Sequence, residues 1–332
     1  MLVRVLLALS NAPLQVVKNM LPLESTAVST VFLRFSAHCA SHRLRAPVLE
    51  RMLARSDGGS RLASWREAAF RRVAASGVGM PAVAAVALQR DWRPVDGPFG
   101  FLATPVHFIA GNRDVRLHPQ GILKIEPDEA EGLAHDFNRD MGNASQHLCL
   151  GRSGQLICVF DQQCLAVTRD PEEALDRDIW EFLPKGADAP RVRLLMSEIE
   201  MWLFEHRVNR ARAARGAPTL SGLWLWGGGP LISTLPALDG WVAGSDAFFG
   251  AFSARTAFAK TAGSGVIVLK DSPGTAEWQD IDTRWILPAL AALRAGRISQ
   301  LQISAADRCF SLSPLATWRV WRRTRPWWQY FE

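Results

Sequence analysis

The chain has 332 residues, of which 48% are hydrophobic and 21% are charged, and its net charge is +6. This composition is typical of a globular protein and excludes a disordered or fibrous chain. A membrane-spanning helix needs about 20 nearly continuous apolar residues, and the longest apolar runs, at 79–88 and 265–269, are far shorter. Because acidic residues accompany the arginines along most of the chain, the positive charge alone does not indicate nucleic-acid binding.

The N-terminal segment, residues 1–26, has mixed composition without sustained periodicity, and we expect it to be an extension outside the fold. Asn11, Pro13 and Lys18 interrupt its apolar patch, which argues against a signal peptide. The cysteines form neither a CxxC pair nor an even disulfide framework, so we expect reduced thiols and a cytoplasmic protein. They are Cys39, Cys149, Cys158, Cys164 and Cys309.

Hydrophobic periodicity predicts a strand and then three helices in the first part of the chain. Glycines at 58 and 59 should end the first helix. Two prolines and two glycines in 91–100 favour a loop-rich crossing after the third helix. The expected ranges are 28–35 for the strand, and 47–55, 65–73 and 82–88 for the helices.

The next part of the chain predicts a small antiparallel sheet. Short, partly alternating runs cover 102–110, 115–117 and 121–125, and Pro127 then opens a helix to about residue 137. Two apolar runs lie on either side of Gly151 to Gly154, where glycines permit a tight turn. We therefore expect a hairpin over 147–160.

A single long helix is predicted between residues 192 and 215. Five of its residues recur at steps of four, three, four and three. This spacing places them on one helix face, which should point into the protein. They are Leu195, Ile199, Trp202, His206 and Asn209.

The C-terminal part alternates strands with helices, which is typical of an α/β sheet. We expect strands at 222–226, 240–243, 265–269 and 298–303, with helices near 247–260 and 286–295. The predicted fold class is α/β, with a mixed sheet flanked by helices and a β-rich antiparallel portion in the N-terminal half. Residues 27–332 should form one domain with lobes at about 27–188 and 189–332.

The segment from Trp224 to Pro230, WLWGGGP, is a strand that runs into three glycines. Glycines let a ligand approach the backbone, and open N–H groups in such a loop can bind an anion. Alternatively, the tryptophans pack a core face and the glycines only turn the chain. Neither a dinucleotide fingerprint nor a Walker motif is present.

The surrounding residues resemble the RpfE-type regulatory proteins, which are themselves similar to cofactor-independent phosphoglycerate mutases. The resemblance rests on EH-x-VN-x-x-R-x-x-x-G from Glu205, followed by WLWGGGP. Further similar pieces are PVLERMLARS at 47–56, TPVHFIAG at 104–111, FLPKG at 182–186 and WRVWRRTRP at 318–326. The likeness covers about residues 45–326, and it departs from the family pattern at Arg207 and Ser221, where Pro and Asn are usual.

The mutases in this comparison use a Ser or Thr nucleophile and two metals held by Asp and His residues. Here no histidine follows His206, and VFLRFSAHCAS at 31–41 stands where a metal-binding Asp is expected. The resemblance therefore implies a regulatory or ligand-sensing protein on a mutase-related scaffold, with no cofactor and no metal site. An active, metal-dependent mutase is the alternative, so whether the chain is an enzyme stays open.

A candidate ligand site combines His206, Asn209 and Arg212, which are spaced to form a phosphate or carboxylate clamp. Its ligand would be a small phosphorylated or carboxylated metabolite. The competing interpretation of His206 is a hydrogen-bonded core histidine near a helix end. The full set of expected ligand-binding residues adds Ser221, Trp226, Gly227, Gly228 and Gly229.

Other clusters carry weaker signals. We interpret His135, Asp136 and Asp140 as a solvated helix end, and His38 with His42 as surface residues. No GxSxG elbow, kinase loop, HExxH, EF-hand or paired-cysteine zinc pattern occurs.

The tail at 318–328 interleaves tryptophan and arginine, a pattern that can stack on bases or sit at a membrane surface. We favour an intramolecular role, in which arginine stacks on tryptophan and pairs with carboxylates. A nucleic-acid-associated regulator is the third functional hypothesis.

Overall fold

The computed structural model describes residues 29–35, 45–88, 98–151, 154–232, 234–244, 246–253, 263–269 and 281–331. The chain forms two compact units: unit 1 comprises Met1–Met80 and Ala237–Glu332, and unit 2 comprises Pro81–Pro236. Unit 2 is thus an insertion into unit 1, whereas the expected division near residue 188 falls inside unit 2. The predictions for 1–26, for His38 and His42 and for most of the 91–100 loop lie outside the described residues.

Unit 1 contains a six-stranded mixed sheet in the order β2-β11-β10-β1-β9-β8. Four strands run parallel, namely β1 (Thr30–Arg34), β8 (Trp241–Gly244), β9 (Gly265–Val268) and β10 (Gln300–Ala305). At one side β11 (Arg308–Leu312) and β2 (Asp57–Arg61) continue the sheet in antiparallel pairing. Every residue of β1 is buried, as expected for a central parallel strand covered on both faces.

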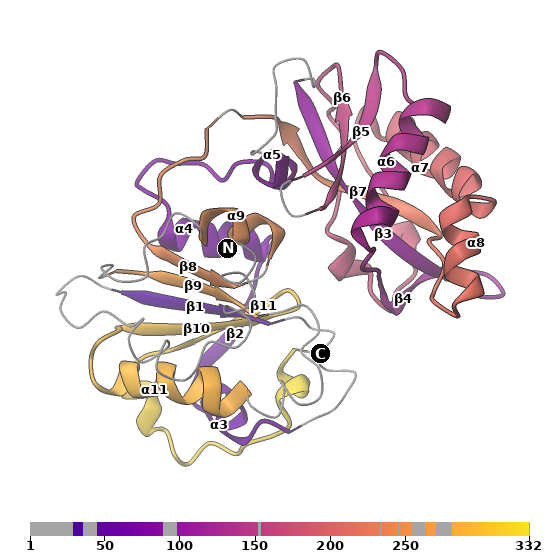
Figure 1. Ribbon diagram of the computed structural model, residues 1–332. Coiled ribbons are helices and arrows are strands. Elements are labelled where there is room, and N and C mark those ends of the chain that lie inside the picture. The colour runs from indigo at the N-terminus through magenta and orange to yellow at the C-terminus, as the bar shows by residue number, and fades with distance from the viewer. Residues whose placement is uncertain are drawn as a thin grey trace, which may run out of the picture. The chain divides into compact units, whose positions relative to one another are not determined.

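Helices cover both faces of this sheet (Figure 1). One face carries α4 (Trp65–Val73) and α9 (Ala247–Ser253), and the other carries α3 (Pro47–Arg55) and α11 (Leu287–Arg294). A π-helical turn, η5 (Asp282–Ile286), precedes α11, and the Asp282 carboxylate accepts the Val48 and Leu49 N–H groups that begin α3. The expected helix at 65–73 is confirmed, and its Ser64 cap accepts a hydrogen bond from the Glu67 N–H.

Unit 2 contains an antiparallel sheet built around the long strand β3 (Phe99–Ala110). β3 pairs with β4 (Val115–Ile122), β6 (Leu156–Phe160) and β7 (Gly222–Pro230), and β6 also pairs with β5 (Gln146–Leu150). The predicted hairpin is therefore confirmed, and the predicted fold class is confirmed by the mixed sheet of unit 1 and this antiparallel sheet. The two short strands expected at 115–117 and 121–125 largely merge into β4.

Four helices of unit 2 pack on this sheet; the last three share one core cluster with it, and the first packs against β3 and β7. They are α5 (Val83–Leu88), α6 (Pro127–Asp140), α7 (Ala189–Phe204) and α8 (Arg207–Ala214). The prediction of one helix over 192–215 is wrong, because the chain leaves helical geometry at His206, which has φ −67° and ψ 142°. Its ring accepts the Val208 N–H and so caps α8. The expected inward face is nevertheless buried at Leu195, Ile199, His206 and Asn209, with Trp202 half-buried.

The glycine run lies within β7, in register with β3, rather than in a loop after the strand. Between the pairs Gly100–Gly229 and Leu102–Trp226, two residues of β7 face Phe101 alone. Gly227 has φ +63°, which identifies a β-bulge that begins with a glycine. A Cβ at Gly228 would lie 2.2 Å from Cε1 of Phe101, so the packing of the strand itself requires a glycine there.

No helix in the described part of the chain is long and apolar enough to cross a membrane.

Candidate functional site

The predicted clamp residues Asn209 and Arg212 are used inside the protein. The Asn209 amide donates to the Leu203 and Leu220 carbonyls, both at 2.8 Å, and accepts the Leu220 N–H at 2.7 Å. These bonds fix the end of α7, the start of α8 and the approach to β7 to one another. Arg212 is buried as well: it donates through Nε to the Pro218 carbonyl and pairs through Nη1 with Glu129 at 2.8 Å.

The predicted residues near β7 are also engaged internally. Oγ of Ser221 accepts the Phe108 N–H at 2.9 Å, and Nε1 of Trp226 donates to Oγ1 of Thr104 at 2.7 Å. Because a strand rises about 3.3 Å per residue, Ser221 and Gly227 lie about 20 Å apart. The eight predicted residues therefore do not converge on one site, and ligand contact by the glycines stays a prediction.

A concavity of about 650 Å³ lies where the ends of α6 and α7 meet the beginning of α8. Among the predicted ligand-binding residues, only His206 lines it. The lining combines three arginines, three acidic residues, an indole and two apolar side chains around that histidine. Its members are Asp136, Arg139, Asp140, Met201, Trp202, Phe204, Glu205, His206, Arg207 and Arg210.

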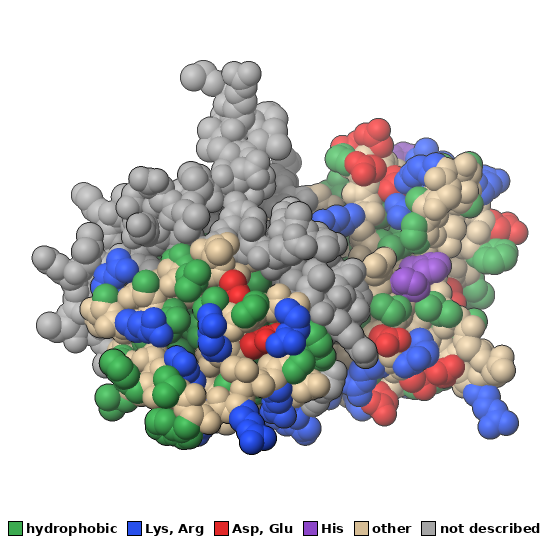
Figure 2. Space-filling view, turned by 90° about the horizontal axis from the view of Figure 1, so that it is seen from below, with side chains coloured by type: hydrophobic (Ala, Val, Ile, Leu, Met, Phe, Trp, Pro, Cys, Tyr) green, Lys and Arg blue, Asp and Glu red, His purple; other side chains and the backbone are tan. Residues whose placement is uncertain are grey.

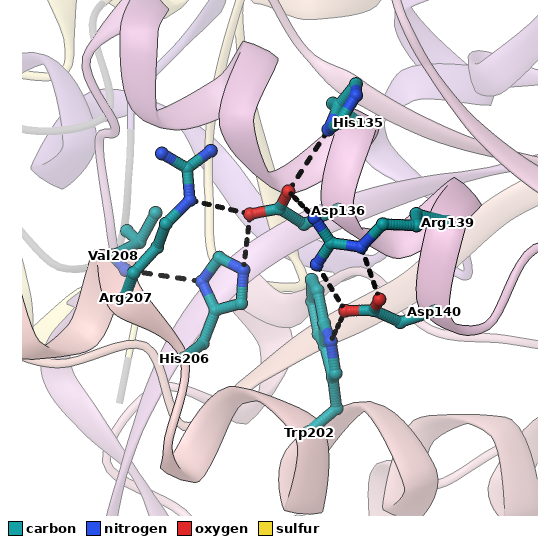
Figure 3. Close-up of polar contacts among 8 residues, drawn as sticks. All are labelled: His135, Asp136, Arg139, Asp140, Trp202, His206, Arg207 and Val208. Carbon is teal, nitrogen blue, oxygen red and sulfur yellow. Dashed lines mark hydrogen bonds and ion pairs between the residues drawn. The ribbon is translucent and has the colours of Figure 1, made fainter.

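The centre of this site is the Asp136 carboxylate, whose side chain is only 4% exposed. One oxygen accepts from Nδ1 of His135 at 3.1 Å and from Nη1 of Arg139 at 3.0 Å. The other accepts from Nε of Arg207 at 2.7 Å and from Nε2 of His206 at 3.1 Å (Figure 3). The hydrogen bonds from Arg207 and His135 outweigh the effect of burial and hold the pKa of Asp136 well below its usual range.

A second carboxylate, Asp140, lies one helical turn further along α6. It accepts a bidentate pair of bonds from Arg139, at 2.7 and 2.9 Å, and a third from Nε1 of Trp202 at 3.1 Å. Arg139 therefore bridges Asp136 and Asp140 (Figure 3). This bridge holds the indole of Trp202 at the wall of the pocket, where it lies 4.4 Å from the His206 ring, centroid to centroid.

The hydrogen bonds of His206 define its tautomer. Nδ1 accepts the Val208 N–H, so the proton resides on Nε2, which donates to Asp136. Burial lowers the pKa of His206, and its attraction to Asp136 only partly opposes that effect. The imidazole is therefore neutral near pH 7 and serves as both a helix cap and a donor.

Two guanidinium groups at the start of α8 remain available to a ligand. Arg207 uses Nε for Asp136, while its terminal amino groups point away from that carboxylate (Figure 3). Its side chain is 62% exposed. Arg210, three residues later on the same helix, is exposed and forms no ion pair with any described residue.

The interpretation of 135–140 as a solvated helix end is wrong for Asp136, which is buried, and fits His135, whose side chain is 75% exposed. Sequence reasoning also passed over Arg139, Arg207 and Arg210. The available signal was the spacing of Asp136 and Asp140 on one helix face, but their partners on α7 and α8 lie more than 60 residues away.

A second location where a metal could bind is the carboxyl ends of the parallel strands in unit 1, because open α/β sheets bind ligands there. Asp246 follows β8, but one of its oxygens pairs with Arg66 at 2.7 Å and the other caps α9 through Phe248 and Phe249. Within the described ranges, no group of three or more His, Cys, Asp or Glu residues could hold a metal ion. These residues do not fit a two-metal centre; the segments after β1 and β9 are outside the described ranges.

Comparison with known proteins relates part of the chain to phosphoglycerate mutases. A region of 145 residues is 31% identical to a 2,3-bisphosphoglycerate-independent phosphoglycerate mutase of Methanothrix thermoacetophila. This region covers 43% of this chain and 36% of that protein. The chain is 28% identical over 177 residues to a probable enzyme of the same kind from Geobacter sulfurreducens, covering 52% and 40%. The matched regions thus span well under half of either relative, and no family model matches the chain.

Solved structures give a weaker likeness. A cofactor-independent phosphoglycerate mutase from Thermoplasma acidophilum is 14% identical, covers 86% of this chain and 90% of its own, and superposes with a TM-score of 0.34. The PH0037 protein of Pyrococcus horikoshii is 12% identical, with coverage of 86% and 87% and a TM-score of 0.33. At these scores the superpositions support no argument, so the relationship rests on sequence. The RpfE-type assignment stays a prediction.

Proposed function

We propose that this protein is a regulatory or ligand-sensing protein on a mutase-related scaffold, and that the pocket around Asp136 binds a small phosphorylated or carboxylated metabolite. The observation that carries the proposal is the pair of guanidinium groups, Arg207 and Arg210, at the rim of a 650 Å³ concavity. A planar guanidinium with unused N–H groups is suited to bidentate recognition of phosphate or carboxylate.

The surroundings of Arg207 favour an anion rather than a cation. Two of the three carboxylates that line the pocket are already bound by arginine: Asp136 by Arg207 and Arg139, and Asp140 by Arg139; the third is the exposed Glu205. The pocket also lies at the N-terminus of α8, where the helix dipole favours negative charge by a few tenths to about 1 kcal/mol. A ligand oxygen at this rim would meet positive potential from two sources.

Hydrogen bonds around Asp136 hold the Arg207 side chain in place. Nε of Arg207 is fixed by a carboxylate that is buried and itself held by three other donors. A preorganised guanidinium loses less side-chain entropy when it binds a ligand, and this increases affinity without new contacts. Trp202, fixed by Asp140, supplies an adjoining apolar wall for the carbon part of a metabolite.

The test is calorimetric titration with 3-phosphoglycerate, 2-phosphoglycerate and inorganic phosphate, supported by thermal shift. We expect saturable binding of at least one of these anions. Arg207→Gln and Arg210→Gln should each weaken it about tenfold or more, because a charge-assisted hydrogen bond contributes about 1.5–3 kcal/mol. Arg113→Gln is the matched control, since Arg113 is an exposed arginine of the same unit outside the pocket. Absence of binding, or equal weakening by the control, contradicts the proposal.

An active phosphoglycerate mutase is the second candidate, favoured by the sequence similarity over 145 residues. It predicts turnover of 3-phosphoglycerate without bisphosphoglycerate and dependence on Mn²⁺ or Mg²⁺. Purified, metal-loaded protein without turnover would eliminate it. Turnover that survives Arg207→Gln would show that any activity resides elsewhere than in the pocket of unit 2.

A further inference from the structure

The C-terminal segment of unit 1 exposes four large hydrophobic side chains within seven residues. Leu315 is 83% exposed, Trp318 75%, Val320 67% and Trp321 74%. Leu315 and Trp318 lie in the short 3-10 helix η6 (Leu315–Trp318), and the other two follow in a turn. Together with Arg323 and Arg325, these residues form what we term the Trp/Arg patch. Clusters of exposed hydrophobic side chains are characteristic of interaction surfaces.

Arginines of the same segment hold it against α3. Arg322 donates through Nη1 to the Ser56 carbonyl at 2.6 Å, and Nη1 of Arg319 contacts the Asp57 carboxylate. In return, Arg55 donates to the Thr317 carbonyl at 2.9 Å. These contacts confirm the expected pairing of the tail with a carboxylate, and they fix the backbone so that Trp318 and Trp321 face outward.

The end of the segment is anchored in the core. Trp327 is fully buried and packs edge-on against Phe35, the residue after β1, with 5.4 Å between the ring centroids. Arg325 stacks over Tyr330 at 4.2 Å, so the expected arginine stacking falls on tyrosine here rather than on tryptophan. With anchors on both sides, Trp318 and Trp321 are displayed by a fixed segment.

The charge of the patch is strongly one-sided. Residues 315–325 contain four arginines and no acidic residue. Of these, Arg319 is neutralised by Asp57, while Arg323 is exposed and forms no ion pair with a described residue. Viewed from below, the side of unit 1 along which the C-terminal segment runs shows hydrophobic and basic side chains together, with few acidic ones (Figures 1 and 2).

We propose that the Trp/Arg patch docks unit 1 on an anionic membrane surface. Tryptophan partitions to the boundary between headgroups and acyl chains, because its ring is apolar and its N–H is polar. Arginines beside it gain about 1 kcal/mol each from the negative surface potential. Side chains exposed by two thirds or more project from the protein instead of lining a groove, as insertion into a lipid interface requires.

The aliphatic members of the patch distinguish a membrane from a nucleic acid. Single-stranded bases stack on tryptophan and arginine, whereas Leu315 and Val320 offer no ring or charge for such stacking. In a lipid interface, all four hydrophobic side chains lose contact with water, and binding strength scales with that buried apolar area. The composition of the patch therefore favours the lipid surface.

The test is co-sedimentation of the full chain with vesicles of phosphatidylcholine alone and of phosphatidylcholine with 30% phosphatidylserine. We expect binding to the anionic vesicles that weakens with salt. Trp318→Ala with Trp321→Ala should weaken it at least tenfold, and Arg323→Gln about fivefold. Trp180→Ala is the matched control, since Trp180 is 66% exposed in unit 2 and should leave binding unchanged. Unaltered melting temperatures would show that these surface variants fold.

Several results would overturn the proposal. These are equal sedimentation with neutral vesicles, insensitivity to the Trp318 and Trp321 substitutions, or an equal loss with Trp180→Ala. Binding of single-stranded DNA without vesicle binding would assign the patch to nucleic acid. A dimer that dissociates in the double variant would assign it to a second copy of this chain. None of these outcomes bears on the pocket of unit 2.

Discussion

Replacing Asp136 by Asn tests the central carboxylate of the pocket. The change removes a charge that four donors share: His135, Arg139, His206 and Arg207. The amide oxygen of Asn can still accept a hydrogen bond, but its NH₂ group faces donors instead of accepting from them. The variant therefore loses most of this network while keeping nearly the same volume.

The expected loss follows from the exposure of each partner. The Arg139 and Arg207 side chains are 60% and 62% exposed, so water screens both of them, and the bond from Arg207 to Asp136 contributes about 1 kcal/mol. His206 is 6% exposed, so its buried N–H left without an acceptor costs a further 1–2 kcal/mol or so. We expect Asp136→Asn to lower the free energy of unfolding by about 3 kcal/mol at pH 7.

The assay is urea denaturation followed by circular dichroism, with Asp140→Asn as the control. The Asp140 side chain is more exposed, at 35%, so water screens its bonds and its replacement should cost clearly less than that of Asp136. Because the pKa of folded Asp136 lies below that of the unfolded chain, its contribution is complete above about pH 4 and is lost as the pH falls further. A loss below 0.5 kcal/mol or so for Asp136→Asn, or equal losses in both variants, would refute the reasoning.

Two further substitutions test the packing of β7 and the titration of the helix cap. Gly228→Ala should destabilise unit 2 by about 2–3 kcal/mol in urea denaturation, because its Cβ would overlap the Phe101 ring. His206→Asn keeps an acceptor that can cap α8 but removes the buried imidazole. Since the pKa of His206 is lowered in the fold, the unfolded chain takes up this proton first, and the parent should lose stability as the pH falls below about 6.5. The variant should show a smaller loss between pH 7.5 and 5.5.

Control measurements separate the specific effects of Gly228→Ala and His206→Asn from a general loss of stability. Gly58→Ala places a Cβ where nothing lies within 4 Å, so its stability should stay within about 0.5 kcal/mol of the parent. Equal costs at Gly58 and Gly228 would contradict the packing argument. For the cap, identical pH profiles of the parent and His206→Asn would show that His206 does not titrate differently in the fold.

Local features of the fold could be predicted from the sequence because local interactions decide them. The helix at 65–73 follows from a Ser cap and an amphipathic pattern, and the hairpin at 146–160 follows from glycines between two apolar runs. The break at His206 could not be predicted in this way. No glycine or proline marks it, and the buried face continues from Leu195 and Ile199 to the polar but buried Asn209 across the break.

The division into units and the pocket both depend on contacts between residues that are far apart in the sequence. No local sequence pattern predicts such contacts. β1 pairs with β10, a strand near the other end of the chain, and β3 receives β7 from beyond α8. The same holds for Asp136: its place on α6 could be predicted, but its burial results from Arg207 and His206 arriving from another helix. The glycine bulge is similar, since only the approach of Phe101 shows why Gly228 carries no side chain.

Two segments near the ends of unit 2, which spans Pro81–Pro236, form a strand pair: Phe99 lies opposite Pro230, and the Leu231 N–H donates to the Pro98 carbonyl at 3.0 Å. Once unit 2 has folded, its two ends are held together whatever the length of chain between them. The two halves of unit 1 are then joined by a short effective loop instead of one as long as all of unit 2. This lowers the entropic cost of bringing the two halves together by about 2 kcal/mol. The insertion therefore assists the assembly of its host, and a cut inside unit 2 that leaves this terminal pair intact should be tolerated by unit 1.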